Sequence, residues 1–221
     1  MKKITAIIII MAFSFCGCSW FAKKEDMRTA QELADDGMAN FNDGKYHKAI
    51  GDFEKLRNRY PFSRYLSLAE LKLADSFFHM EEYEDAVLSY EHFESMHPAN
   101  EAVPYVIYQI GMCYYEQLRG PDRDQAPSEN ALKNFNRLIS QYPDSQYARK
   151  AVEPVGVCNA RLAEHDFLVG EFYYEKEHYE AALLRFEKLL THYKDVGIHH
   201  KALNYIALCK EAIKGQKLKK E

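Results

Sequence analysis

The sequence predicts an all-α protein built from repeated helix pairs that stack into a solenoid. Three observations support this fold class. Apolar residues recur at spacings of three and four, which is the period of a helix face and not of a strand. Glycine and proline are scarce, with 10 and 7 among 221 residues. A pattern of small, aromatic and proline residues also repeats along the chain with a step of 37 residues.

The repeat is clearest in the stretches GKYHKAIGDFEKLRNRYP and EEYEDAVLSYEHFESMHP. Matching residues 37 positions apart are Tyr46 and Tyr83, Ala49 and Ala86, Phe53 and Tyr90, Leu56 and Phe93, and Pro61 and Pro98. A small residue recurs upstream of them, as Gly37, Ala74 and Gly111. The third unit has extra residues in LRGPDRDQAPS and continues with Ala131, Phe135, Leu138, Tyr142 and Pro143. The fourth carries Gly170, Ala182, Phe186, Leu189 and Tyr193, with Lys194 in place of the proline.

This pattern resembles the tetratricopeptide repeat, a helix–turn–helix unit. A glycine or alanine in the first helix lets the two helices cross closely, and the aromatic residue of the second helix fills the groove beside it. Proline cannot continue a helix, so it ends each pair. A coiled coil is disfavoured because these prolines interrupt any long heptad run. We expect about four full helix pairs plus a C-terminal capping helix over residues 199–214, since a solenoid must cover its last apolar face.

The segment from Gln146 to Lys176 is longer than one repeat helix. It fits a single long helix that joins the third and fourth units. Pro154 also permits a kink, or a helix start near Glu153. The sequence leaves these arrangements open.

The N-terminus has the organisation of a signal peptide. Lys2 and Lys3 precede an apolar run from Ile4 to Phe15, which is shorter than the roughly 20 residues that a transmembrane helix needs. The following FCGC resembles the bacterial lipobox, with Cys18 as the acylated residue.

Within this lipobox, Gly17 and Cys16 occupy the two positions before Cys18, and Phe15 stands where leucine is preferred. Cys16 does not fit as the acylated residue because bulky Phe15 precedes it. Several acyl chains, each worth about 0.8 kcal/mol per buried methylene, give stable membrane anchoring. Ser19 stands where an aspartate favours retention in the inner membrane, so the outer membrane is expected.

The predicted domain organisation follows from these features. Residues 1–17 form a signal peptide, 18–27 a lipid-anchored linker, 28–215 the tetratricopeptide-repeat domain and 216–221 a basic tail. The tail is interpreted as a solvated helix end, with contact to anionic lipid headgroups as the alternative.

Charge and motifs exclude several function classes. The net charge is −4, and it becomes more negative when Lys2 and Lys3 are removed, which argues against a nucleic-acid binder. The sequence has no glycine-rich phosphate loop, no nucleophile elbow and no HExxH motif. We therefore expect no enzyme activity, no cofactor and no metal. Cys113, Cys158 and Cys209 lack zinc-site spacing and are expected to be small core residues.

Three longer sequence segments resemble the BamD family of lipoproteins, also called ComL or YfiO. They are NRYPFSRY (Asn58 to Tyr65), DRDQ (Asp122 to Gln125) followed by NFNRLISQYPDSQYA, and RLAEHDFLVGEFYY (Arg161 to Tyr174). The resemblance covers about Ala30 to Ala202. It departs from the family at the C-terminus, where the family commonly completes a fifth repeat.

The resemblance implies a subunit of the β-barrel assembly machinery, anchored in the outer membrane and facing the periplasm. Its implied partners are the periplasmic domains of BamA, other lipoproteins of the machinery and unfolded outer-membrane proteins. The alternative is a tetratricopeptide lipoprotein that serves as scaffold for another envelope complex, such as a secretin pilot or a cell-division coordinator. A cell-wall enzyme ranks third.

Two residues are candidates for partner binding. Tyr60 ends the second helix of the first unit, directly before Pro61, where substrate handling is expected; the alternative is that it only packs against the second repeat. Arg185 is expected at the edge of the apolar stripe of the fourth unit, and no acidic residue stands three or four positions from it. It is therefore a candidate for a bidentate bond to a carboxylate of another chain. The alternative is a solvated arginine whose stem covers Phe186.

Overall fold

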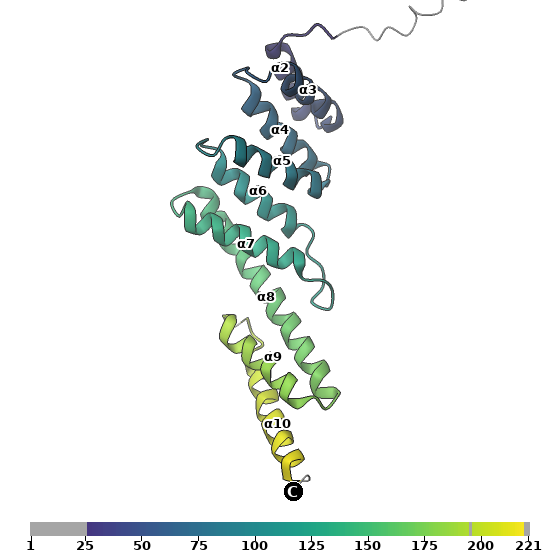
Figure 1. Ribbon diagram of the computed structural model, residues 1–221, viewed down its shortest axis with the longest axis vertical. Helices are drawn as coiled ribbons and strands as arrows, with labels where there is room; N and C mark the ends of the chain where they lie inside the picture. The colour runs from purple at the N-terminus through teal and green to yellow at the C-terminus, as the bar shows by residue number, and fades with distance from the viewer. Residues whose placement is uncertain (1–25, 195, 219–221) are drawn as a thin grey trace, which may run out of the picture.

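The computed structural model describes residues 26–194 and 196–218, and within these ranges the chain forms nine helices and no strand. The predicted signal peptide, Cys18 and the end of the basic tail lie outside the described residues. The helices follow one another along the long axis of the molecule, with α2 at one end and α10 at the other (Figure 1). They are α2 (Ala30–Asn42), α3 (Tyr46–Arg59), α4 (Leu66–His79), α5 (Tyr83–Met96), α6 (Val103–Tyr115), α7 (Ala126–Gln141), α8 (Gln146–Glu175), α9 (Tyr179–His192) and α10 (His199–Leu218).

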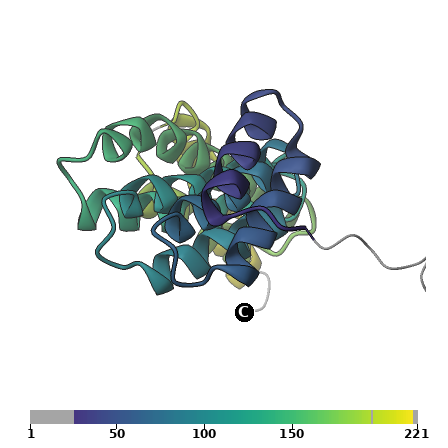
Figure 2. The ribbon, with the colours of Figure 1, turned by 90° about the horizontal axis from the view of Figure 1, so that it is seen from above.

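The described helices form four antiparallel pairs and one further helix. The pairs are α2 with α3, α4 with α5, α6 with α7, and α8 with α9, and α10 covers the end of the last pair. Seen from above, successive pairs are rotated relative to one another about the long axis (Figure 2). The predicted solenoid of four pairs plus a capping helix is thereby confirmed. The capping helix is longer than expected, since it runs past residue 214 to Leu218.

Small residues allow the two helices of a pair to approach closely, as the repeat pattern predicts. A Cβ added to Gly37 would lie 2.5 Å from Cε1 of Phe53, which belongs to the second helix of the same pair. In the fourth pair, a Cβ added to Gly170 would lie 2.7 Å from Cε1 of Phe186. The aromatic ring therefore occupies the space that a side chain on the first helix would take.

The long segment after the third pair is one uninterrupted helix, α8, with Pro154 inside it. Its first half contributes Ala148 and Ala151 to the buried cluster of the third pair. Its second half contributes Ala163 and Phe167 to the cluster of the fourth pair. The sequence left a kink or a later helix start open, and the structure shows that α8 joins the two pairs as one helix.

Local signals set the helix ends. Thr29 begins α2 with a capping box, in which its hydroxyl accepts from the Glu32 amide at 3.2 Å and the Glu32 carboxylate accepts from the Thr29 amide at 2.7 Å. Helices α3, α5 and α7 each end two residues before a proline, at Arg59, Met96 and Gln141 respectively.

The three described cysteines are buried and free, as expected of core residues. Burial raises the pKa of the Cys113 thiol to about 12 and that of Cys158 to about 11. These thiols are therefore protonated and unreactive near neutral pH. Among the described helices, none has the length and hydropathy required to cross a bilayer.

Candidate partner-binding sites

Tyr60 caps the C-terminal end of α3, and the structure gives it internal contacts. Its ring is half-buried against the apolar cluster that α2, α3 and α4 share, which includes Phe53 and Leu73. Its hydroxyl donates a hydrogen bond of 2.9 Å to the carbonyl of Arg28. Tyr60 therefore ties the segment before α2 to the first helix pair, and it packs against a cluster to which α4 contributes. Its part in substrate handling stays a prediction.

Arg28 is the centre of a charged cluster that fixes the same segment. Its guanidinium lies 2.6 Å from Asp26, 2.6 Å from Asp36 and 2.8 Å from buried Asp52. Lys55 adds a second cation to Asp26 at 2.9 Å. Hydrogen bonds from Arg28 and Lys55 hold the pKa of Asp26 well below its usual range. The chain is thus bound to the first helix pair from Asp26 onward.

Phe62 presents the most open aromatic surface of this region. It lies in the turn between α3 and α4, two residues after Tyr60, and its side chain is 100 % exposed. In the same turn the guanidinium of Arg64 stacks over the ring of Tyr65 at 4.8 Å. A turn that carries an exposed aromatic ring and a guanidinium suits an extended partner peptide with apolar and acidic side chains.

Arg185, on α9, forms an ion pair within its own chain. Its Nη1 donates to Oδ1 of Asp166 at 3.0 Å, and Asp166 belongs to α8, the first helix of the same pair. No acidic residue stands three or four positions from Arg185 on α9, but α8 supplies Asp166 as a carboxylate partner from the same chain; binding of a partner protein by Arg185 stays a prediction. Spacing along α9 alone missed Asp166, because the pairing of helices brings together residues 19 positions apart.

The Asp166 carboxylate is only 2 % exposed and has three partners. Besides Arg185, the Lys188 ammonium lies 2.7 Å from Oδ2 and the Tyr193 hydroxyl donates to Oδ2 at 3.0 Å. Burial, and then the charge of Asp166, raise the pKa of the Tyr193 hydroxyl far above its ordinary value. Arg185 thus stabilises a buried carboxylate, yet 40 % of its side chain is exposed and can still meet a partner.

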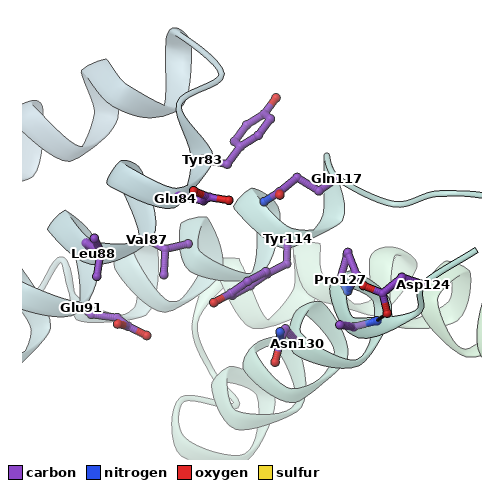
Figure 3. A pocket seen from close by; sticks show the side chains of 11 residues that line it. Tyr83, Glu84, Val87, Leu88, Glu91, Tyr114, Gln117, Asp124, Pro127 and Asn130 are labelled. Carbon is purple, nitrogen blue, oxygen red and sulfur yellow. Dashed lines mark hydrogen bonds between the residues drawn. The ribbon is translucent and has the colours of Figure 1, made fainter.

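A hollow of about 420 Å³, here called the acidic groove, lies between α5, the end of α6 and the start of α7 (Figure 3). Apolar lining comes from Val87, Tyr114 and Leu88, whose side chain is 65 % exposed. Glu84 and Glu91 supply acidic groups along α5. Such a surface suits a partner segment that carries apolar and basic side chains.

The acidic groove is not evident from the sequence, because the acid-rich stretch EEYED has the composition of a solvated turn. A signal was present in the spacing of α5: residues 84, 87, 88 and 91 share one face of a helix and combine acids with apolar side chains. The contribution of α6 and α7 could be known only from their packing. Among the described residues, no group of His, Cys, Asp and Glu side chains is arranged to hold a metal ion.

Comparison with known proteins adds the family. A family model described as outer membrane lipoprotein, YfiO, matches residues 26–221. The chain is 26 % identical over 204 residues to the outer membrane protein assembly factor BamD of Caulobacter vibrioides, a match covering 90 % of this chain and 67 % of that protein. It is 27 % identical to the proteins of the same name from Rickettsia prowazekii (88 % and 78 % covered) and Pasteurella multocida (92 % and 82 % covered).

A solved tetratricopeptide repeat protein from Parabacteroides merdae is 13 % identical, with 80 % of this chain and 98 % of that chain covered; its TM-score of 0.32 marks a slight similarity. The match to the family model, in contrast, covers all the described helices, from the capping box of α2 to the end of α10. The chain therefore belongs to the YfiO family of outer-membrane lipoproteins.

Proposed function

We propose that this protein is a lipid-anchored adaptor of the β-barrel assembly machinery that acts on the periplasmic side of the outer membrane. One observation carries the proposal: the outer-membrane lipoprotein family model matches residues 26–221, which include every described helix. The relatives are named outer membrane protein assembly factor BamD, and this name indicates the process in which we propose that the protein acts, the assembly of outer-membrane proteins.

The anchor is the acylated Cys18. Seven residues separate Cys18 from Asp26, where ion pairs bind the chain to the first helix pair. Such a short tether supports an orientation in which the first pair lies near the membrane and the array extends into the periplasm.

The array separates two partner-binding regions along one solenoid. The turn with Phe62, beside Tyr60, receives unfolded outer-membrane proteins at the N-terminal end. The surface around Arg185 and Lys188 binds the periplasmic domains of BamA in the fourth pair. Because the two regions lie in different pairs, one adaptor holds substrate and barrel subunit at the same time. Other lipoproteins of the machinery complete the set of partners.

The adaptor works by binding and positioning, without catalysis. A solenoid whose pairs contact only their neighbours gives an extended surface for such binding. The raised thiol pKa values of Cys113 and Cys158 agree with this, since they remove two nucleophiles at neutral pH.

Affinity purification of the full-length protein from gently solubilised outer membranes tests the proposal. We expect BamA and further assembly lipoproteins to be enriched over a tagged, unrelated lipoprotein. Mass spectrometry of the same preparation should find an acylated N-terminal Cys18. Enrichment of a secretin or of cell-division proteins instead would favour the alternative scaffold.

A further inference from the structure

The two most exposed large apolar side chains among the described residues lie at the same end of the molecule. Phe62 is 100 % exposed and Met27 is 83 % exposed. Met27 belongs to the segment before α2, and Phe62 lies in the turn between α3 and α4. The chain enters the array here, at the end of the long axis that α2 occupies (Figure 1). Apolar surface is therefore open to water where the chain enters the array.

Hydrogen bonds hold these two segments side by side. Nη1 of Arg59 donates to the carbonyl of Asp26, and the hydroxyl of Tyr60 donates to the carbonyl of Arg28. Both donors stand at the end of α3, directly before the turn that carries Phe62. The segment before α2 and this turn therefore form one continuous surface.

The turn itself is held in one conformation. The amide of Ser63 donates to the carbonyl of Tyr60 at 3.0 Å, which closes a four-residue turn with Pro61 and Phe62 at its centre. Proline favours the second position of such a turn because its φ is already fixed. The amide of Tyr65 donates to the Ser63 hydroxyl at 3.2 Å and fixes the way out of the turn. Since Pro61 and Phe62 are both exposed, the turn holds the aromatic ring out in water.

This surface is basic, although the chain as a whole is acidic. Residues 57–68 contain three arginines and no acidic residue, while the net charge of the chain is −4. Two of the three, Arg59 and Arg64, flank the exposed ring. Within the part of the chain that the structure describes, Arg59 bonds to a carbonyl and Arg64 to the hydroxyl and ring of Tyr65, and neither pairs with a carboxylate.

The acids of α3 and of the segment before α2 already face cations. Asp26 and Asp52 lie 2.6 and 2.8 Å from Arg28. Glu54 lies 4.0 Å from Arg57. The two arginines beside the exposed ring are therefore available to an anionic group outside the chain.

The tether limits how far this surface can lie from a bilayer. Seven residues separate Asp26 from Cys18, the proposed acylated residue. A fully extended stretch of this length spans at most about 30 Å. A bilayer surface offers phosphate groups, which a guanidinium binds through two hydrogen bonds, and beneath them an apolar boundary that accepts exposed apolar side chains. Tether length and charge thus favour lipid as the partner of this surface.

We propose that the surface formed by Met27, Arg59, Phe62 and Arg64, here called the N-terminal patch, binds the membrane in which the acyl chains of Cys18 lie. Its apolar side chains insert at the level of the headgroups, and its guanidinium groups bind lipid phosphates. This contact rests on the acylation of Cys18 in the proposed function.

A second membrane contact has a consequence for orientation. Acyl chains alone hold the protein at the membrane but leave it free to turn about its tether. With the N-terminal patch also bound, the first helix pair keeps one side toward the lipid. The turn proposed to receive unfolded outer-membrane proteins then lies at the lipid surface, and a substrate that binds the ring takes the place of lipid.

Tryptophan fluorescence of the full-length acylated protein in vesicles of phosphatidylethanolamine and phosphatidylglycerol tests the proposal. Trp20, the only tryptophan of the chain, is replaced by phenylalanine, and Phe62→Trp places a single fluorophore in the turn. Its emission should shift to shorter wavelength and be quenched about twofold by lipids brominated near the headgroup end of their acyl chains. Leu184→Trp in the same background, exposed in the fourth pair, is the control and should be neither shifted nor quenched.

A second substitution tests the part that charge plays. Arg64→Gln, added to the Phe62→Trp variant, should weaken the quenching because one guanidinium no longer binds a phosphate. Arg123→Gln, at a 70 % exposed arginine in the loop before α7, is the matched control and should leave the quenching unchanged. Equal quenching in both variants would overturn the role of the guanidinium group.

Flotation of the same vesicles separates this proposal from the proposed function. If the protein floats with the vesicles but the tryptophan at position 62 is quenched no more than the one at position 184, the anchor holds and the membrane contact is overturned. If the protein does not float, acylation of Cys18 is wrong and the contact falls with it. Shielding of the tryptophan at position 62 only after an unfolded outer-membrane protein is added would assign the turn to that substrate alone, and would also overturn the membrane contact.

Discussion

The ring of Phe135 lies so close to Gly111 that a Cβ at position 111 would be 2.5 Å from Cε1 of Phe135. The same contact recurs in the first and fourth pairs, so the spacing between paired helices depends on a missing side chain. Phe135 is fully buried in the core between α6 and α7, and its ring cannot move aside without displacing its neighbours.

Gly111→Ala should therefore destabilise the protein, although alanine favours helix formation. We expect the free energy of unfolding to fall by about 1–3 kcal/mol, as for other overpacked cores. Gly156→Ala is the matched control, because a Cβ there meets no atom within 4 Å and the residue lies inside α8. That change should raise stability by about 0.5–1 kcal/mol. If Gly111→Ala and Gly156→Ala change the free energy of unfolding equally in denaturant titrations, the contact with Phe135 does not set the helix spacing.

Substitutions at Phe62 and Tyr60 should distinguish an effect on substrate binding from an effect on the stability of the first helix pair. Phe62→Ala removes a fully exposed ring, so stability should change by less than about 0.5 kcal/mol while crosslinking to an unfolded outer-membrane protein falls. Tyr60→Phe removes the hydrogen bond to the Arg28 carbonyl and should cost about 1 kcal/mol of stability. Leu184→Ala, another exposed apolar residue, is the control for crosslinking. Undiminished crosslinking in Phe62→Ala would remove this turn from the substrate site.

Arg185→Lys should distinguish the two roles of the arginine. Lysine keeps a positive charge near buried Asp166, so the melting temperature should change little, but it lacks the planar fork that binds a carboxylate of another chain. We expect at least tenfold weaker binding to the periplasmic domains of BamA. If the affinity stays the same, Arg185 acts only on Asp166.

Charge reversal at the same position is less informative. Arg185→Glu would place a carboxylate beside buried Asp166 and should lower the melting temperature by itself. A loss of binding in that variant would then report on folding as well as on recognition.

The acidic groove should bind a basic amphipathic peptide. Replacing Glu84 and Glu91 together by glutamine should weaken binding of a lysine- and leucine-rich probe about three- to tenfold, as expected for two exposed ion pairs. The melting temperature of this double variant should not fall, because replacing the two glutamates removes repulsion between neighbouring carboxylates. Glu101→Gln, in the loop before α6, is the control. A probe affinity that is insensitive to both the substitutions and salt would show that the groove is not a charge-dependent site.

The fold could be predicted from sequence because each pair repeats the same local signals. Small residues, aromatic residues and prolines recur in register, and the structure uses them as close contacts and helix ends. The continuous course of α8 could not be predicted, because Pro154 is compatible with a helix start as well as with a position inside a helix.

The contacts of the candidate site residues could not be predicted from the sequence, because they are made between helices. Arg185 has no acidic neighbour on α9, but the helix pair brings Asp166 to it. The hydroxyl of Tyr60 bonds to a carbonyl 32 residues away. Neither distance follows from spacing along one helix. Phe62 lies in the segment NRYPFSRY, but its full exposure follows only from the turn that carries it.

The most direct test of the proposed function measures folded β-barrel proteins in the outer membrane when this protein is depleted from the bacterium that encodes it. Heat-modifiable gel mobility reports the folded fraction. We predict that folded barrel proteins fall as the protein is depleted and recover with the intact chain, but not with Cys18→Ala, which removes the proposed acylation site. Unchanged levels of folded barrel proteins after full depletion would contradict the proposed role in β-barrel assembly.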